Sequence, residues 1–316
     1  MNRFGIFILV TALSFLNHII GYDLAVVSMF RDEAPYLKEW IEYHRLVGVQ
    51  HFRLYCDYRS DDNWKEVLQP YIDEGLLEVV KNWFVPGDYY AMHIAQQCSA
   101  NMDAIQHLDG QAEWIAFIDI DEFLLPMKEK TVPECLRAHF SNADAVYVNW
   151  RNFGTSDLYI PKGEPILCQL YGCSLKSHSK NSSGKTIVRT RCARPAHSWS
   201  PHFCPLQEGY FYVNGSCESM GWLLWTADGA QTPAVDGKHH GKYLRINHYS
   251  FRDEQFFLEK RMKPAILGER EYTVDLLKEQ HNSFSIVKDY TIEQFLRKNY
   301  PETYQSFWEP YSRFGK

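Results

Sequence analysis

The sequence predicts an α/β fold in which a mostly parallel sheet is flanked by helices. Short apolar runs alternate with helical patterns over the first 150 residues, which is typical of a doubly wound sheet. The run 114–118 is apolar throughout, as expected of a parallel strand that is buried on both faces. The expected strands are 24–30, 52–56, 76–80, 114–118 and 145–148, and the expected helices are 35–47, 64–72 and 89–108.

The pattern changes after residue 150, which indicates a second region. Residues 150–245 are rich in Gly, Pro, Cys, Trp and Tyr and contain only short extended pieces, such as 185–189. Helical patterns return near 251–263 and at 292–299. We therefore divide the chain into 1–21, 22–150 and 151–316, with no internal repeat or low-complexity tract.

The composition sets limits on partners and size. Of 316 residues, 45% are apolar, which is enough for one large core or two modest ones. The net charge is −6 and no Lys/Arg block stands out. These features exclude nucleic acid as an expected partner.

Residues 1–21 have the pattern of a secretory signal peptide. Arg3 provides a positive start, residues 4–16 form an apolar core, and Gly21 is a small residue at the expected cleavage point. The alternative is an uncleaved anchor, which would be the only contact with a membrane. Either would direct the protein into the secretory pathway, in the Golgi or ER lumen or outside the cell.

Eight cysteines fit an exported protein, and five of them lie between residues 168 and 217. We expect disulfides to staple this region, without any pairing being evident from the spacing. Asn181 and Asn214 begin N-glycosylation patterns, which predict a glycoprotein if the source is eukaryotic.

The segment Asp119-Ile120-Asp121-Glu122 follows the apolar run 114–118 directly and is the strongest functional signal. Open α/β sheets bind ligands at the carboxyl ends of their strands. If the segment is extended, Asp119 and Asp121 point the same way and can share one hard cation. Such a cation could bridge two phosphates of an activated donor, which predicts group transfer from a nucleotide-linked substrate.

Two other strand ends carry charged loops, at 31–33 and 57–62. The carboxyl ends of neighbouring parallel strands lie along one edge of a sheet. Each loop alone would be interpreted as solvated surface, but three in successive units predict a nucleotide-sugar site.

Several blocks of the sequence together resemble glycosyltransferase family 92 and related family-2-like glycosyltransferases. The resemblance covers roughly residues 23–265, and its first and third blocks are the most specific. The blocks are Phe30-Arg31-Asp32-Glu33-Ala34-Pro35-Tyr36-Leu37-Lys38-Glu39-Trp40-Ile41-Glu42-Tyr43-His44, then 48–52, 114–123, 150–154, 185–189, and His248-Tyr249 ahead of 256–260.

The resemblance implies a GT-A fold, a nucleotide-sugar donor, a divalent metal and inversion at the anomeric carbon. Mn²⁺ is the expected metal, with Mg²⁺ as the alternative. The implied reaction moves a hexose, which is galactose in the animal members that this chain resembles, from a donor (a UDP-sugar is favoured) to a glycan or glycoconjugate acceptor. The region after residue 150 would then form the acceptor side.

The resemblance also implies roles for individual residues. Arg31 and Glu33 would border the nucleoside, and Asp57 would accept a hydrogen bond from the base. Asp119 would contact ribose or metal, and Asp121 would ligate the metal. Tyr58 departs from the Asp-Asn usual in the family, which leaves the base-binding corner less defined. Two basic residues, Lys185 and Arg189, would add charge at the phosphates, with a solvated strand face as the alternative.

An inverting displacement needs a base that takes the proton of the acceptor hydroxyl. Glu218, in a turn-rich stretch with nearby aromatics, is the first candidate, and Asp228 and Glu208 are rivals. His248 is the preferred histidine to complete the metal site, ahead of His202, with a structural histidine as the alternative. The pair 239–240 is interpreted as part of a solvated loop.

Two other classes of function stay open at this point. One is a non-catalytic secreted carbohydrate-binding or interaction protein, in which the acidic strand ends have no role. The other is a phosphatase with an Asp-x-Asp nucleophile motif. That chemistry usually has a small residue two positions after the second Asp, where Phe123 stands, so it is less favoured.

Overall fold

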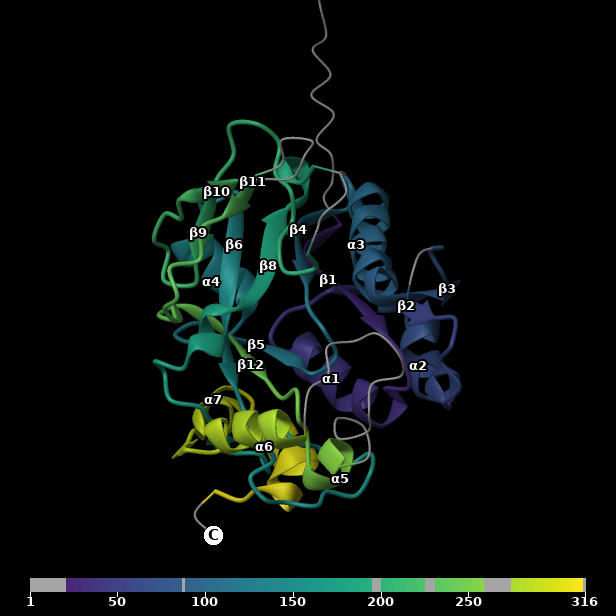
Figure 1. The fold of residues 1–316 in the computed structure, drawn as a ribbon. Helices are drawn as coiled ribbons and strands as arrows, with labels where there is room; N and C mark the ends of the chain where they lie inside the picture. Colours follow the sequence, from purple (N-terminus) through teal and green to yellow (C-terminus); the bar gives the residue numbers. More distant parts are fainter. Residues whose placement is uncertain (1–20, 87–88, 195–199, 225–230, 259–273, 315–316) are drawn as a thin grey trace, which may run out of the picture.

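The computed structural model describes residues 21–86, 89–194, 200–224, 231–258 and 274–314 (Figure 1). Its centre is a nine-stranded sheet, and the path of hydrogen-bonded neighbours is β3-β2-β1-β4-β8-β6-β12-β5, with β9 paired to β6. The strands are β1 Tyr22–Phe30, β2 His51–Asp57, β3 Leu77–Trp83, β4 Ala112–Phe117, β5 Glu122–Pro126, β6 Ala145–Asn152, β8 Gly184–Arg189, β9 Tyr212–Asn214 and β12 Leu244–His248.

The first four strands of the chain form a parallel half of this sheet. β1 pairs in parallel with β2 on one side and with β4 on the other, and β3 continues beyond β2. Alternate residues of β1 enter two different cores: Leu24 and Val26 face one, whereas Ala25 and Val27 face the other. Burial on both faces explains why β1 and β4 are largely apolar, whereas the outer strand β3 is only partly buried and carries charged residues.

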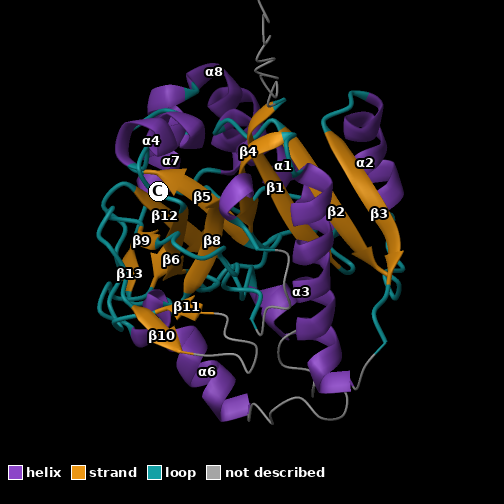
Figure 2. Ribbon diagram, turned by 90° about the horizontal axis from the view of Figure 1, so that it is seen from above, coloured by secondary structure: helices purple, strands orange, loops and turns teal. Residues whose placement is uncertain are grey.

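The other half of the sheet is mixed and is built from distant segments. β8 runs antiparallel to both β4 and β6, and β5 runs antiparallel to β12. β12 is parallel to β6. As a result, β8, from the region after residue 150, continues the sheet directly from β4, and β12, from the same region, follows beyond β6 (Figure 2).

Helices cover both faces of the parallel half. Leu37, Trp40 and Ile41 of α1 pack into the core on one face, and Ala104 and Leu108 of α3 pack into the core on the other. The helices are α1 Ala34–Leu46, α2 Trp64–Asp73, α3 Tyr89–Leu108, α4 Val132–His139, α5 Glu254–Phe256, α6 Val274–Ser283, α7 Thr291–Asn299 and α8 Pro301–Thr303.

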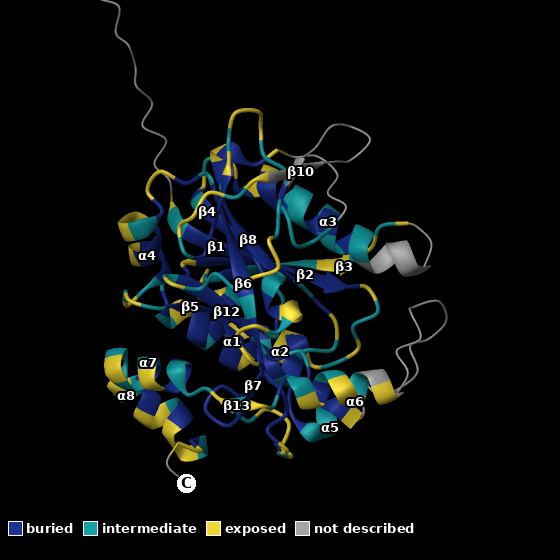
Figure 3. Ribbon diagram, turned by 60° about the vertical axis from the view of Figure 1, so that its left-hand side comes forward, coloured by how far each residue is buried: buried dark blue, intermediate teal, exposed yellow. Residues whose placement is uncertain are grey.

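The remaining elements are short and lie around the sheet. In Figure 3 the central strands are mostly buried, whereas the outer helices alternate between buried and exposed residues. The short elements are the strands β7 Gly172–Cys173, β10 Trp222–Leu224, β11 Gln231–Pro233 and β13 Val287–Lys288, the 3-10 helices Ser179–Ser182, Thr190–Cys192 and Glu309–Tyr311, and a π-helix at Tyr304–Trp308.

The α/β class and the parallel order of the first strands are confirmed, and α3 has the predicted bounds. The stop of α1 is also confirmed, because Gly48 has a φ of 95° and Val49 N donates to His44 O. The helix expected over 251–263 is α5 in its described part, and residues 259–263 lie outside the described residues. The sequence did not reveal β5, α4, β12 and α6.

The expected disulfides are wrong for this structure. All eight cysteines are described and all are free thiols, and only Cys217 is exposed. The other seven cysteines are packed in the interior. Burial raises the pKa of the Cys173 thiol, for example, to about 11. The region 168–217 is therefore held by packing and by β-pairing.

The two N-glycosylation patterns lie in buried positions. Asn181 is fully buried, and its Oδ1 accepts hydrogen bonds from Asn152 and Ser174. Asn214 is also buried, and its amide donates to Glu218. Both asparagines thus have structural roles that leave no exposed amide for a glycan.

The helices of the described residues were compared with the length and hydropathy of a membrane span. Within them, no helix has the length and apolar character needed to cross a bilayer. The predicted signal peptide falls almost wholly on residues 1–20, which lie outside the described part of the chain.

Candidate functional site

The carboxyl ends of β1 and β4 lie side by side, and they form the switch point of the parallel half. β1 has β2 on one side and β4 on the other, so connections leave toward opposite sides here. A small depression lies at this point, where ligands bind in open α/β sheets. It is lined by Val27, Ser28, Met29, Gln97, Asn101, Phe117, Ile118, Asp119, Lys185 and Pro201.

The acidic segment after β4 is a turn and does not continue the strand. Glu122 N donates to Asp119 O at 3.1 Å, and Trp40 Nε1 of α1 donates to both Asp119 O and Glu122 O. The expected extended geometry of 119–121 is therefore wrong. The chain reverses because β5 starts at Glu122 and leaves in a new direction.

Asp119 is held by two partners from other elements. Lys185 Nζ of β8 lies 2.9 Å from Asp119 Oδ2, and Gln97 Nε2 of α3 donates to Oδ1 at 3.1 Å. The Lys185 side chain is 3% exposed, whereas that of Asp119 is 35% exposed. Burial alone would lower the pKa of Lys185, but the neighbouring Asp119 and Glu122 carboxylates raise it above its usual value. Lys185 is therefore a fixed positive charge beneath the acidic turn.

Asp121, Glu122 and His248 form the group best suited to hold a cation. One ligand atom from each lies within 4.8 Å of the others. His248 Nε2 is 3.7 Å from Asp121 Oδ1, and Tyr249 N donates to Asp121 O at 2.8 Å. β12 and β5 pair in register at His248 and Glu122, so sheet pairing itself brings these two residues together.

His248 is fixed in orientation by its neighbours. Its Nδ1 lies 3.0 Å from Asn152 Oδ1, which leaves Nε2 directed toward Asp121. The Trp150 ring lies 4.3 Å from the His248 ring and 5.2 Å from that of His202. A metal-binding histidine commonly donates its second nitrogen to such an oxygen. His202 instead contacts Gly184 O through Nδ1, and burial and the charge of Lys185 lower its pKa to about 4.

The residues present fit a divalent cation. Glu122 is fully buried, and its Oε1 has no hydrogen-bond partner. Burial raises the pKa of Glu122 well above its usual value; Lys185 opposes this, and Asp119 and Asp121 add to it. A cation would provide the positive charge that an ionised Glu122 lacks, and oxygen and imidazole ligands suit Mn²⁺ or Zn²⁺. Asp119, the other expected ligand, lies outside this group of three, and its oxygens contact Lys185 and Gln97.

The two other charged loops are joined, as expected from the sheet order. Asp32 N donates to Ser60 Oγ, and Asp61 N donates to Asp32 Oδ1. Ala34 N, at the start of α1, donates to Asp62 Oδ2 at 2.7 Å. The loops after β1 and β2 therefore form one surface at the carboxyl edge.

Asp57 is buried at the end of β2 and is bound by Arg59. Arg59 Nε and Nη2 lie 2.9 and 2.7 Å from the two carboxylate oxygens, and Arg59 N also donates to Oδ1. Burial opposes ionisation of Asp57, but the hydrogen bonds and charge of Arg59, with a smaller effect of Arg31, hold its pKa below the usual value. Tyr58 is exposed and packs against Phe84.

Arg31 and Glu33, the two residues expected at the nucleoside, both lie at the carboxyl edge of the sheet but differ in their contacts. Glu33 Oε2 accepts from Arg252 Nη2 at 2.7 Å, which ties the loop after β1 to the segment after β12. The Arg31 side chain is 48% exposed and lies 4.0 Å from Asp32. Arg31 is thus free to meet a ligand at the rim, whereas Glu33 holds the edge together.

The structure does not bring Arg189 to this site. β8 runs antiparallel to β4, so Lys185 lies at the carboxyl end of β4 while Arg189 is paired with Trp114 near its start. Arg189 contacts Glu113, Ala143 O and Ser141 O. Lys185 and Arg189 are thus four residues apart on β8, but only Lys185 reaches the candidate site.

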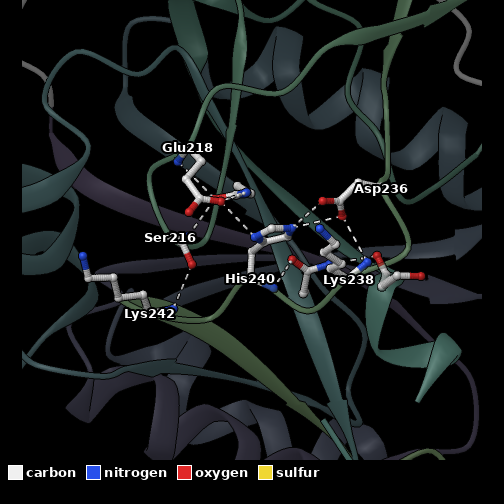
Figure 4. Close-up of polar contacts among 9 residues, drawn as sticks. Ser216, Glu218, Asp236, Lys238, His240 and Lys242 are labelled. Carbon is white, nitrogen blue, oxygen red and sulfur yellow. Dashed lines mark hydrogen bonds and ion pairs between the residues drawn. The ribbon is translucent and has the colours of Figure 1, made fainter. Parts of the chain in front are cut away.

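Glu218 lies in a separate polar cluster, shown in Figure 4. His240 stands between two carboxylates: its Nδ1 is 2.9 Å from Glu218 Oε2, and its Nε2 is 3.0 Å from Asp236. Asn214 also donates to Glu218. The Glu218 side chain is 62% exposed. Asp228, the rival base, lies outside the described residues, and Glu208 is exposed.

Sequence reasoning missed Glu122, Trp150, Asn152 and Gln97 as parts of the site. Glu122 stands beside Asp121 in the sequence, so adjacency was a usable signal. Gln97 and Asn152 carry no local signal, because only the packing of α3 and the pairing of β6 with β12 places them at the edge.

The class of protein follows from this fold together with comparison to known families. The model of glycosyltransferase family 92 matches residues 25–211, which is more than half of the chain. The chain therefore belongs to glycosyltransferase family 92. The predicted α/β, GT-A-type fold class agrees with the sheet and its flanking helices.

Relatives with curated names belong to the same family. A glycosyltransferase family 92 protein of Oryza sativa subsp. japonica is 30% identical over 200 residues, covering 61% of this chain and 31% of the relative. One from Ricinus communis is 23% identical over 265 residues, covering 82% of this chain and 40% of the relative. The chain thus spans between about a third and two fifths of the length of these relatives.

Two solved structures are similar over less than half of the chain. Glucosyl-3-phosphoglycerate synthase of Mycobacterium tuberculosis, in complex with Mn²⁺, uridine diphosphate and glucosyl-3-phosphoglycerate, is 16% identical with a TM-score of 0.27, covering 42% of this chain and 45% of that one. The mannosyltransferase Ktr4p of S. cerevisiae is 8% identical with a TM-score of 0.28, covering 43% and 41%.

Proposed function

We propose that this protein is a metal-dependent, inverting glycosyltransferase that moves a hexose from a nucleotide-sugar to a glycan acceptor. The observation that carries the proposal is the group of Asp121, Glu122 and His248 beside the Asp119–Lys185 pair, at the switch point of the sheet. Membership of glycosyltransferase family 92 supports the transfer of a sugar.

The roles of the site residues follow from their charge and position. Asp121, Glu122 and His248 would hold the cation, with Mn²⁺ expected and Mg²⁺ as the alternative. When bound, the cation would act as a Lewis acid that neutralises the leaving diphosphate. Asp119, held by Lys185 and Gln97, would contact ribose, and the Lys185 charge would attract the phosphates to the depression beside Ser28.

The rim of the site would bind the nucleoside. Arg31 and Glu33 border the loop after β1, and Asp57 lies one strand further along, at the end of β2. Because Arg59 covers Asp57, a base would meet the Arg59 guanidinium and the exposed Tyr58 before it meets the carboxylate. A UDP-sugar stays the favoured donor, with galactose as a possible sugar.

The catalytic base is proposed from side-chain chemistry. Glu218 is the first candidate, since it is exposed and its partner His240 could share a proton taken from an acceptor hydroxyl. Asp228 stays the second candidate. An acceptor in the secretory pathway is proposed, because the expected signal peptide leads into a lumen where sugar nucleotides are available.

The experiment is a nucleotide-release assay with a panel of UDP- and GDP-sugars and oligosaccharide acceptors, in Mn²⁺, in Mg²⁺ and in excess chelator. We expect turnover with one UDP-hexose in Mn²⁺ and none in chelator. Asp121→Asn should lower kcat/KM at least about 100-fold, because removing a ligand or its orientation weakens metal binding and activity strongly. Asp73→Asn, on the exposed surface of α2, is the matched control and should leave activity unchanged.

The outcomes separate the proposed function from the alternatives. Full activity of Asp121→Asn, or turnover in chelator, would remove the metal role. Binding of a glycan without any nucleotide release from the whole panel would favour a non-catalytic carbohydrate-binding protein. Release of phosphate from simple phosphomonoesters would favour the phosphatase.

A further inference from the structure

A second group of metal-ligand side chains lies outside the sheet-edge site. Asp157 follows β6, Glu254 begins α5 and His281 lies near the end of α6, and one ligand atom of each lies within 4.8 Å of the others. We propose that this group binds a divalent transition-metal cation, which fastens α5 and α6 to the turn after β6. The proposal does not depend on the proposed glycosyl transfer.

His281 is held as a metal-binding imidazole would be. Its ring stacks on Phe257 at 4.7 Å with an interplanar angle of 20°, and the edge of Phe251 lies 5.7 Å away. Its Nδ1 is directed at Asn282 Oδ1 at 3.4 Å, so the other nitrogen, Nε2, faces the group. A side-chain oxygen that orients the second nitrogen is a regular feature of metal-bound histidines.

The Thr155 hydroxyl joins two ligand atoms of the group. Thr155 is fully buried, and its hydroxyl contacts both His281 Nε2, at 2.7 Å, and Glu254 Oε1. His281 Nε2 and Glu254 Oε1 are 3.4 Å apart, so the imidazole and the carboxylate converge on one point. A cation at that point would take both as ligands, in place of their contacts with the hydroxyl.

The two carboxylates of the group have no basic ion-pair partner in the described part of the chain. Neither Asp157 nor Glu254 forms an ion pair with Lys or Arg there, and Glu254 Oε1 instead lies 3.4 Å from His281 Nε2. The Asp157 N–H is directed at Thr155 Oγ1 at 3.2 Å, which keeps the residue against the group. Glu254 N donates to Leu158 O at 2.8 Å, which fixes the start of α5 against the same turn.

The ligand set indicates the class of metal. One imidazole and two carboxylates, with a hydroxyl beside them, suit Zn²⁺ or Mn²⁺ better than Ca²⁺, which takes oxygen ligands. The turn continues directly from the sheet-edge site, because Phe153 N donates to His248 O at 2.9 Å. A cation here would thus stabilise the segment that follows His248 and the two helices that close over it.

The test counts metal ions on the full chain. The protein is stripped with chelator, reloaded with Zn²⁺ or Mn²⁺ in separate arms, desalted, and measured by mass spectrometry of the metal. The wild type should bind two equivalents, His248→Gln one, Asp157→Asn one, and the double variant none. Asn tolerates the left-handed backbone of Asp157 (φ 57°), so Asp157→Asn retains the local fold. His281→Gln provides a second variant of the same site.

Thermal unfolding provides a readout that does not involve activity. In the His248→Gln background, the metal should raise Tm, and Asp157→Asn or His281→Gln should abolish that rise. The proposal is overturned if His248→Gln binds no metal, or if Asp157→Asn and His281→Gln bind as much as the wild type. A wild type that binds one equivalent, lost in Asp157→Asn but not in His248→Gln, would support this site and count against the sheet-edge site instead.

Discussion

The parallel and mixed halves of the sheet contribute different chemistry to the same edge. Strands β1, β2 and β4 of the parallel half end in acidic loops, whereas β8 and β12 of the mixed half provide the basic residue and the imidazole that meet those acids. Asp119 and Lys185 are 66 residues apart in the chain. Each acidic loop of the site is therefore a short stretch of sequence, whereas the residues that balance its charge come from strands far along the chain.

A similar difference is seen in how the two halves are held together. The parallel half is a series of strand–helix units, and its two cores also include residues of the later region, such as Ile246 and Val188. Besides these cores and the sheet, buried polar side chains join the two regions, of which Glu39 of α1 is the clearest. The Glu39 carboxylate accepts hydrogen bonds from Ile166 N, Leu167 N and Trp308 Nε1.

Removing the Glu39 carboxylate should have the largest effect on stability. Glu39→Ala leaves three buried donors without an acceptor, which should lower the free energy of unfolding by about 3–5 kcal/mol. Chemical denaturation followed by circular dichroism measures the change. Glu42→Ala is the matched control, because Glu42 is only half-buried and binds one hydroxyl, that of Tyr71. Equal losses in the two variants would mean that Glu39 does not join the two regions.

Removing the Lys185 charge should have the next largest effect. In Lys185→Met the acidic turn loses its buried cation, and we expect a loss of about 2–3 kcal/mol, less than for a fully buried pair because Asp119 is partly exposed. Added Mn²⁺ should restore more stability in this variant than in the wild type. Lys185→Arg is the control, which keeps the charge. A Lys185→Met protein that is as stable as the wild type would show that the acids do not need this partner.

His44 should make stability fall on acidification. Its Nδ1 contacts Trp40 O and its Nε2 accepts from Leu124 N, which requires the neutral ring. Burial lowers its pKa from 6.5 to about 3. The unfolded chain therefore takes up a proton below pH 6.5 that the folded chain refuses until about pH 3, so stability is lost as pH falls between these values.

The His44 effect is measured as a difference between the wild type and His44→Gln. The stability advantage of the wild type should shrink by about 2 kcal/mol between pH 6.5 and 4.5. The difference isolates His44 from Glu39, whose pKa is raised to about 7 mainly by burial and which therefore has the opposite slope. Parallel stability curves for the two proteins would contradict the neutral, buried state of His44.

Arg189 should have the smallest effect on activity. Because it lies at the far end of β8 from Lys185, Arg189→Lys should leave kcat/KM within about twofold of the wild type and lower stability by about 1 kcal/mol. A steady-state nucleotide-release assay and a thermal melt check the two parts. A tenfold loss of kcat/KM with unchanged stability would instead indicate that Arg189 acts on the donor phosphates.

The parallel strands could be predicted from sequence because each is a local pattern. Apolar runs buried on both faces, Gly48 and the periodicity of α3 are visible without knowledge of any other segment. β5 was missed because its first residue, Glu122, belongs to the acidic motif. β12 was missed because it is only five residues long, although Leu244 and Ile246 alternate with Arg245 and Asn247 as in a strand. The disulfide prediction was wrong because it relied on the expected export of the chain. In the structure the cysteines between residues 168 and 217 are free thiols, and all but Cys217 are buried.

By itself, the sequence determined the α/β class, the family and the acidic strand ends, since these depend on the order of residues along single segments. Only the tertiary structure decided that Lys185 rather than Arg189 meets Asp119, that Glu122 and His248 face each other, and that Asp57 is covered by Arg59. The physical reason is that antiparallel pairing and register, which are set by distant strands, choose which residue of a strand reaches the edge.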